Sequence, residues 1–127
     1  MHYLKNKYFN RWARKHGISD AILLDAISEF EKGLYEANLG NHLYKKRVAL
    51  AGRGKSGGAR TILFFQQGKK LIFCFGFEKN SQSNVTDQER RLLDKLADSY
   101  QHSTEYEIID DIKCGDLIRI LVRRADK

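Results

Sequence analysis

Two stretches near the start of the chain carry apolar side chains at the spacing of an α-helix. In residues 6–16 these are Phe9, Trp12 and Ala13, with His16 on the same face, and in residues 21–31 they are Ile22, Leu23, Ala26, Ile27 and Phe30. Gly17 ends the first stretch, and Ser19 is placed to cap the second. The pattern predicts two amphipathic helices that pack as an antiparallel pair.

After Gly40 the helical spacing gives way to alternation between apolar and polar residues. Alternating or apolar runs over residues 43–50, 60–66 and 70–77 predict three strands. A Gly-rich basic turn joins the first two, and Gln67-Gly68 makes a tight turn before the third. The third run is apolar on both faces, which is typical of the centre of a sheet. We therefore expect an antiparallel meander of three strands.

The last third of the chain begins with a helix signal. Thr86 and Glu89 form a capping box, and the helix that they open carries Leu92, Leu93, Leu96 and Tyr100. Residues 103–114 are weakly helical, and residues 116–122 alternate as a short last strand would. The expected fold class is α+β, with residues 1–127 as one domain and residues 103–127 as a C-terminal extension packed on it.

Composition narrows the class of protein. Hydrophobic residues make up 42% of the chain and charged residues 31%, which indicates a folded globular domain rather than a disordered tail. No apolar run is long enough to span a membrane, and the first residues lack the apolar core of a secretion signal, so we expect a cytoplasmic protein. Cys74 is expected in the core, and Cys114 has no assigned role. The histidines lack metal-ligand spacing, so no metal and no cofactor are expected.

The net charge of +7 is unevenly distributed. Residues 1–60 hold 12 Lys and Arg against 5 Asp and Glu, whereas residues 61–127 hold 11 of each. The excess is densest between residues 41 and 60, which include no acidic residue. Such a charge distribution attracts a polyanion, most simply nucleic acid, although an acidic protein would respond to the same field. A membrane surface fits less well, because this window is predicted as strand and loop rather than amphipathic helix.

Strand alternation sorts these cations by face. Lys45 and Arg47 share one face of the first predicted strand, while Lys46 falls on the core side and must lie at a strand end or extend its amine to solvent. Arg60 begins the neighbouring strand and is expected close to Lys45 and Arg47. Clustered cations repel one another, and a bound phosphate would compensate for that repulsion. The alternative is a solvated basic face without function.

Two further segments adjoin this face. The turn over residues 52–58 is not a nucleotide-binding P-loop, because its Gly-Lys-Ser is followed by two glycines and a strand instead of a helix. We interpret it as a mobile basic turn in which Arg53 and Lys55 contact a polyanion. At the end of the third strand, Lys79 and Asn80 lie at the rim of the sheet. Phe77 is either a core residue or a platform for a stacked base.

Three segments together resemble the RelE/HigB-type toxins of bacterial type II toxin–antitoxin systems, in the RelE/ParE superfamily. They are residues 43–49 (LYKKRVA), 54–61 (GKSGGART) and 75–80 (FGFEKN), and the resemblance extends over about residues 1–101. It implies a small mRNA interferase with a RelE-like fold that cuts mRNA on the ribosome and so inhibits translation and growth. It also implies a cognate antitoxin as the protein partner.

The resemblance assigns roles to the clustered cations. The implied catalytic residues are Lys45, Arg47, Arg60 and Lys79, and the implied RNA-binding residues are Lys46, Arg53, Lys55, Phe77 and Asn80. In metal-free cleavage the ribose 2′-OH attacks the adjacent phosphorus, and clustered cations stabilise the charge that develops there. Arg47 and Arg60 would clamp the phosphate. Lys45 would act as the general base, and Lys79 would be a second cation or the proton donor.

Other functions remain open on the sequence. Asn80 stands where well-studied members have an arginine, and Thr86 stands near where some have a tyrosine, which favours a non-catalytic RNA- or ribosome-binding module of the same fold. A toxin with another target, like the gyrase-poisoning ParE relatives, is a third hypothesis, which the dense cation cluster opposes. A plain interaction protein would bind its partner independently of salt, whereas polyanion contacts weaken steeply with salt.

Overall fold

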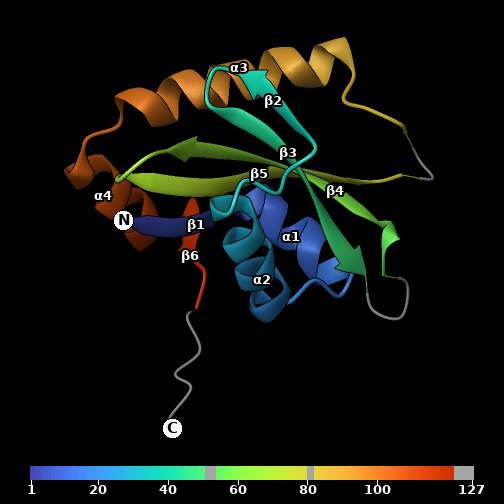
Figure 1. Cartoon of the computed structure of the whole chain (residues 1–127). Helices are drawn as coiled ribbons and strands as arrows, with labels where there is room; N and C mark the ends of the chain where they lie inside the picture. Colours follow the sequence, from blue (N-terminus) through green and yellow to red (C-terminus); the bar gives the residue numbers. More distant parts are fainter. Residues whose placement is uncertain (51–53, 80–81, 122–127) are drawn as a thin grey trace, which may run out of the picture.

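The computed structural model describes residues 1–50, 54–79 and 82–121, and shows an α+β fold (Figure 1). Helices α1 and α2 cover one face of the sheet and α3 crosses the other. In chain order the elements are β1 (His2–Asn6), α1 (Lys7–Lys15), α2 (Asp20–Glu31), β2 (Ala37–Gly40), β3 (Leu43–Leu50), β4 (Gly54–Gln66), β5 (Lys70–Glu78), α3 (Asp87–His102), α4 (Glu105–Cys114) and β6 (Leu117–Arg119).

The sheet is larger than the predicted meander. Its six strands follow the order β2-β3-β4-β5-β1-β6, and every described pair is antiparallel except β1 with β5. The antiparallel β3-β4-β5 meander is confirmed, but the expectation of a three-stranded sheet was wrong. The three additional strands have only 5, 4 and 3 residues. Strand β6 lies within the short last strand expected over residues 116–122, whereas β1 and β2 were not predicted. Strand β4 also begins at Gly54, six positions earlier than predicted.

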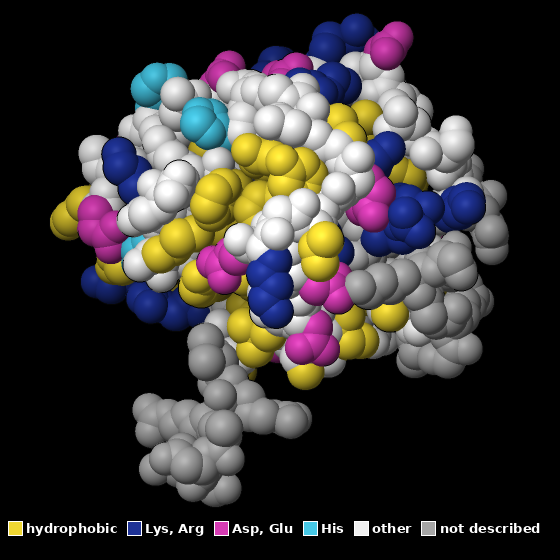
Figure 2. All heavy atoms as spheres, viewed as in Figure 1, with side chains coloured by type: hydrophobic (Ala, Val, Ile, Leu, Met, Phe, Trp, Pro, Cys, Tyr) yellow, Lys and Arg dark blue, Asp and Glu magenta, His cyan; other side chains and the backbone are white. Residues whose placement is uncertain are grey.

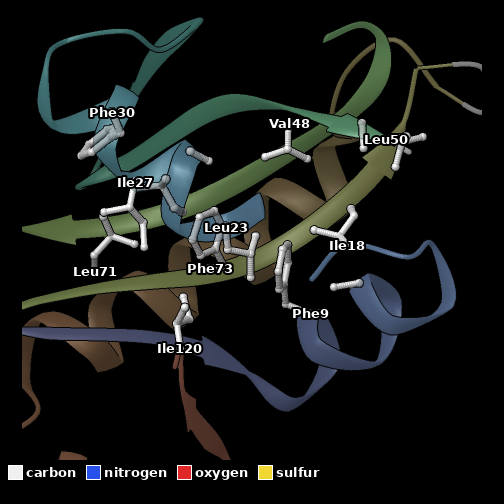
Figure 3. Packing of buried hydrophobic residues seen from close by; sticks show 14 residues of the cluster. Phe9, Ile18, Leu23, Ile27, Phe30, Val48, Leu50, Leu71, Phe73 and Ile120 are labelled. Carbon is white, nitrogen blue, oxygen red and sulfur yellow. The ribbon is translucent and has the colours of Figure 1, made fainter. Parts of the chain in front are cut away.

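Hydrophobic side chains fill both spaces between helices and sheet. On the side of α1 and α2, Phe9, Leu23 and Phe73 are almost completely buried and pack in one cluster (Figure 3). On the side of α3, Ile62 and Leu93 belong to a second cluster. Successive residues of each strand point to opposite faces, so the sheet contributes side chains to both clusters. A sheet residue can therefore be assigned to a face when its cross-strand partner belongs to one of the two clusters.

The predicted helix starts are confirmed by their caps. The Ser19 side chain accepts a hydrogen bond from the amide of Ile22, and Thr86 and Glu89 form the capping box that starts α3. A second capping box, from Thr104 and Glu107, starts α4. These side chains satisfy amide groups that have no partner inside the helix.

The segment after residue 103 contributes to the same sheet. It forms two elements, α4 and β6, and β6 pairs with β1 through the register partners Leu4↔Arg119 and Asn6↔Leu117. The amide of Leu121 then donates to the Asp20 carboxylate at the start of α2. Among the described residues, no helix is both long enough and apolar enough to cross a membrane.

Candidate functional site

Three of the predicted cations lie together on the α3 side of the sheet. Arg47 on β3 and Arg60 on β4 are direct cross-strand partners, and Lys45 lies two residues before Arg47. Alternation places all three side chains on one face, which we call the basic face. Ile62, the register partner of Lys45, packs in the α3-side cluster, which identifies that face. All three cations are partly buried.

Arg47 is held by a carboxylate that the sequence analysis did not single out. One oxygen of Glu36 accepts a hydrogen bond from the Arg47 amide, and the other accepts from Nε at 2.9 Å. The amide of Glu36 itself donates to the carbonyl of Lys45 at 2.9 Å. Glu36 immediately precedes β2, a strand that the sequence analysis did not predict. The alternation of Tyr35, Ala37 and Leu39 before the Gly40 turn is the signal that could have located this strand.

Unlike Arg47, Arg60 has a side-chain donor whose hydrogen bonding is not satisfied by the described residues. Its Nη1 atom is buried and has no hydrogen-bond partner within the described part of the chain. A buried guanidinium donor without an acceptor is costly, and a bound anion would remove that cost. Arg47 stands directly opposite, so the two guanidinium-bearing residues of adjacent strands can share one anion.

The sequence of the chain matches a family model. The model is described as the RelE toxin of the RelE/RelB toxin–antitoxin system, and it matches residues 1–120. The chain belongs to the RelE toxin family. A comparison with curated proteins found no match. Family membership makes the protein a toxin of a toxin–antitoxin system, with a cognate antitoxin as its partner.

Two predicted RNA-binding residues of the toxin are buried. Lys46 points to the opposite face, is only 3% exposed, and forms an ion pair with Glu29 of α2 at 2.8 Å. The core-side placement of Lys46 was expected, but a buried and paired amine cannot contact RNA, so we remove Lys46 from the site. Phe77 is 3% exposed and packs near Phe75, so its ring is not available to stack on a base.

The remaining predicted residues are only partly described. Lys79 is exposed just after the end of β5, two residues beyond Phe77, which is the register partner of Arg60. Arg53 and Asn80 lie outside the described residues of the toxin. Lys55 belongs to β4, but its side chain lies outside the description. Thr86, near the position of a tyrosine in some relatives, uses its hydroxyl to cap α3.

An apolar patch on the toxin surface is separate from the basic face. Figure 2 shows exposed hydrophobic side chains near the end of α2 and the start of β2. In this region Leu34 and Tyr35 are exposed, and the Tyr35 ring contacts those of Phe30 and Tyr44. Tyr44 packs against the cluster on the side of α1 and α2. The patch therefore belongs to the other side of the sheet from Lys45.

Proposed function

We propose that the toxin cleaves mRNA on the basic face, by attack of a ribose 2′-OH on the adjacent phosphorus. The observation that carries this proposal is the buried Nη1 of Arg60, which lies beside a second arginine and has no hydrogen-bond partner among the described residues. Two adjacent cations with an unused donor match a phosphate group in charge and in hydrogen bonding. RNA offers that group next to its own nucleophile.

The two arginines would stabilise the transition state. When the 2′ oxygen attacks, negative charge builds up on the non-bridging oxygens of the phosphorus. Arg47 is already oriented by Glu36, and Arg60 keeps a buried donor that no described residue uses, so both are placed to bond these oxygens once the phosphate reaches the basic face. Preoriented donors aimed at developing charge are commonly the largest contribution to catalysis.

Lys45 and Lys79 would move the protons. Lys45, next to Arg47 on the basic face, would take the proton from the 2′-OH as the bond from O2′ to phosphorus forms. Lys79, just beyond the register partner of Arg60, would donate a proton to O5′ as the bond between phosphorus and O5′ breaks. The products would be a 2′,3′-cyclic phosphate and a free 5′-OH. Removal and donation of protons by positioned side chains typically accelerate such reactions by about 10²–10⁴-fold.

The test is induced expression of the native toxin and of Arg60→Ala in a bacterial host, with mRNA ends mapped by primer extension. We expect growth arrest and new cuts with the native toxin only, and loss of the cuts when translation is blocked, if cleavage takes place on the ribosome. Arg91→Ala, at an exposed position of α3, is the matched control and should behave like the native toxin. Cleavage at the native rate by a folded Arg60→Ala variant would overturn the proposal.

One observation favours a second candidate, a non-catalytic RNA- or ribosome-binding module. The Thr86 hydroxyl is engaged in the capping box of α3, so it is not free for chemistry. Gel retardation of RNA by the native toxin without any cleavage, on and off the ribosome, would support this candidate. Loss of retardation in Arg60→Ala would then still place the RNA on the basic face.

A further inference from the structure

On its outer side, the second half of β5 is not paired with any strand of the described residues. Strand β1 pairs with β5 only from His2↔Lys70 to Lys5↔Phe73, and the chain then turns into α1 (Figure 1). Among the described strands, residues 74–78 of β5 therefore have a neighbour, β4, on one side only. An open strand edge presents amide and carbonyl groups that can pair with another extended chain.

The carbonyls at the two ends of this edge accept hydrogen bonds from a side chain and from a loop amide, instead of from the backbone of a neighbouring strand. The Asn6 side chain donates to the carbonyl of Cys74 at 3.2 Å, and the amide of Gln82 donates to the carbonyl of Glu78 at 3.3 Å. Residues two apart in a strand turn their backbone groups to the same side. The amide and carbonyl of Gly76 therefore face the open edge, between these two occupied positions.

A groove of about 540 Å³ follows this edge and has aromatic walls. Trp12 from α1 lies directly over Gly76, so closely that a Cβ atom there would be 2.3 Å from the indole ring. Phe75 lines the groove from the other side of the strand, and His16 Nε2 contacts a carboxylate oxygen of Glu78 at 2.9 Å in the same groove. The edge thus offers both backbone hydrogen bonds and an apolar slot for a side chain.

The charge beside the groove indicates what would bind there. Helix α1 carries four Lys and Arg and no acidic residue, and Arg11 and Lys15 are exposed one position before the groove residues Trp12 and His16. An acidic partner is therefore attracted to this side. RNA is also acidic, but its phosphates would meet the outward carbonyl of Gly76, which repels them. An extended peptide supplies both donors and acceptors and matches the edge.

We propose that an extended, acidic segment of the cognate antitoxin binds as an added strand along residues 75–78 of β5, with one apolar side chain against Trp12. Phe77 on this edge is the register partner of Arg60 on β4, so only β5 would separate the bound segment from Arg60. An acidic segment at that distance would lower the local positive potential. The inference rests on the antitoxin that family membership implies, and it does not depend on RNA cleavage.

Residue-resolved amide exchange tests the added strand directly, in the toxin alone and in its complex with full-length antitoxin. We expect the Gly76 amide to exchange at least about tenfold more slowly in the complex, because a hydrogen bond to the antitoxin replaces water. The Phe77 amide, which faces β4 in both states, is the internal control and should not change. A Gly76 amide that exchanges equally fast in the saturated complex would overturn the proposal.

A charge-reversal pair tests the chemistry of the partner. Arg11→Glu with Lys15→Glu should weaken antitoxin binding about tenfold, as expected for two lost charge contacts. Arg91→Glu with Lys95→Glu, which has the same spacing on an exposed part of α3, is the matched control and should leave binding unchanged. Equal effects of the two pairs would show that only net charge matters, and would overturn the site. Weaker RNA binding with unchanged antitoxin binding would show that the edge takes RNA instead.

Discussion

Arg47 and Arg60 stand directly opposite each other on neighbouring strands, with both side chains on one face of the sheet. Like charges placed opposite one another in a sheet are destabilising. The two residues also differ in their surroundings, since Arg47 is bonded twice by Glu36, whereas the buried Nη1 of Arg60 has no partner within the described chain. Arg47 is therefore fixed by the protein, whereas Arg60 keeps a side-chain donor that no described residue uses.

Replacing Glu36 tests whether the fixed arginine depends on its carboxylate. Glu36→Gln should lower the rate of RNA cleavage about tenfold, and Glu36→Ala should lower it further, because Arg47 loses its orienting hydrogen bonds. Single-turnover cleavage of a defined RNA on the ribosome measures the effect. Glu31→Gln, which alters a carboxylate bonded by Tyr3 on the other side of the sheet, is the control. Faster cleavage by Glu36→Ala would show that Glu36 competes with RNA for Arg47.

The Lys46–Glu29 ion pair is expected to stabilise the fold and to have no role in RNA binding. Glu29→Ala should lower the free energy of unfolding by about 2 kcal/mol, because it leaves a buried ammonium unpaired while the Glu29 side is partly solvated. Adding Lys46→Met should recover most of that loss, which urea unfolding of all three variants measures. The double variant should also cleave RNA like the native toxin. Impaired cleavage by a stable double variant would return Lys46 to the site.

Any side chain at Gly76 is predicted to lower the stability of the toxin, because the indole ring of Trp12 lies against this position. Gly76→Ala should destabilise the toxin by about 2 kcal/mol, since its methyl group would overlap the indole of Trp12. Shortening the ring residue, by Trp12→Leu, should make the Gly76→Ala change less costly, so that the two effects are not additive. Thermal or urea unfolding of the single and double variants measures the coupling. Strict additivity would contradict the overlap.

The two cysteines are expected to differ sharply in reactivity. Burial raises the pKa of Cys74 to about 12, whereas Cys114 is exposed at the end of α4. At pH 8 only about one Cys74 in ten thousand would be a thiolate, and the thiolate is the reactive form. A disulfide reagent should therefore label one thiol per native chain, and the second only as the chain unfolds. Rapid labelling that persists in Cys114→Ser would contradict this expectation.

Much of the fold could be predicted because its signals are local. Ser19 and Thr86 start helices through bonds to amides three residues away, and alternation within 43–50 defines β3 without reference to the rest of the chain. Strand β6 lies within the short last strand that alternation predicts over residues 116–122. Strands β1 and β2 were not predicted, because each is short and each is stabilised by a neighbouring strand.

In the candidate site, too, the residues that local signals determine could be predicted and their partners from other elements could not. Lys45, Arg47 and Arg60 could be placed together because alternation and a hairpin fix their relative positions. The partners of these strands could not be predicted, since Glu36 reaches Arg47 through the pairing of β2 with β3, and Glu29 reaches Lys46 from a helix in another layer. Contacts between layers depend on packing that no sequence period records.

The position of β1 has a consequence for the order in which the toxin can fold. Strand β1 lies between β5 and β6, so the first described strand to be synthesised needs the last one to complete its pairing. Helices α1 and α2 and the β3-β4-β5 meander can form earlier, because their contacts are closer in sequence. We therefore expect the strands of the basic face to pair during synthesis before the sheet has all six of its strands. The pairing of β6 with β1 is then the last to form.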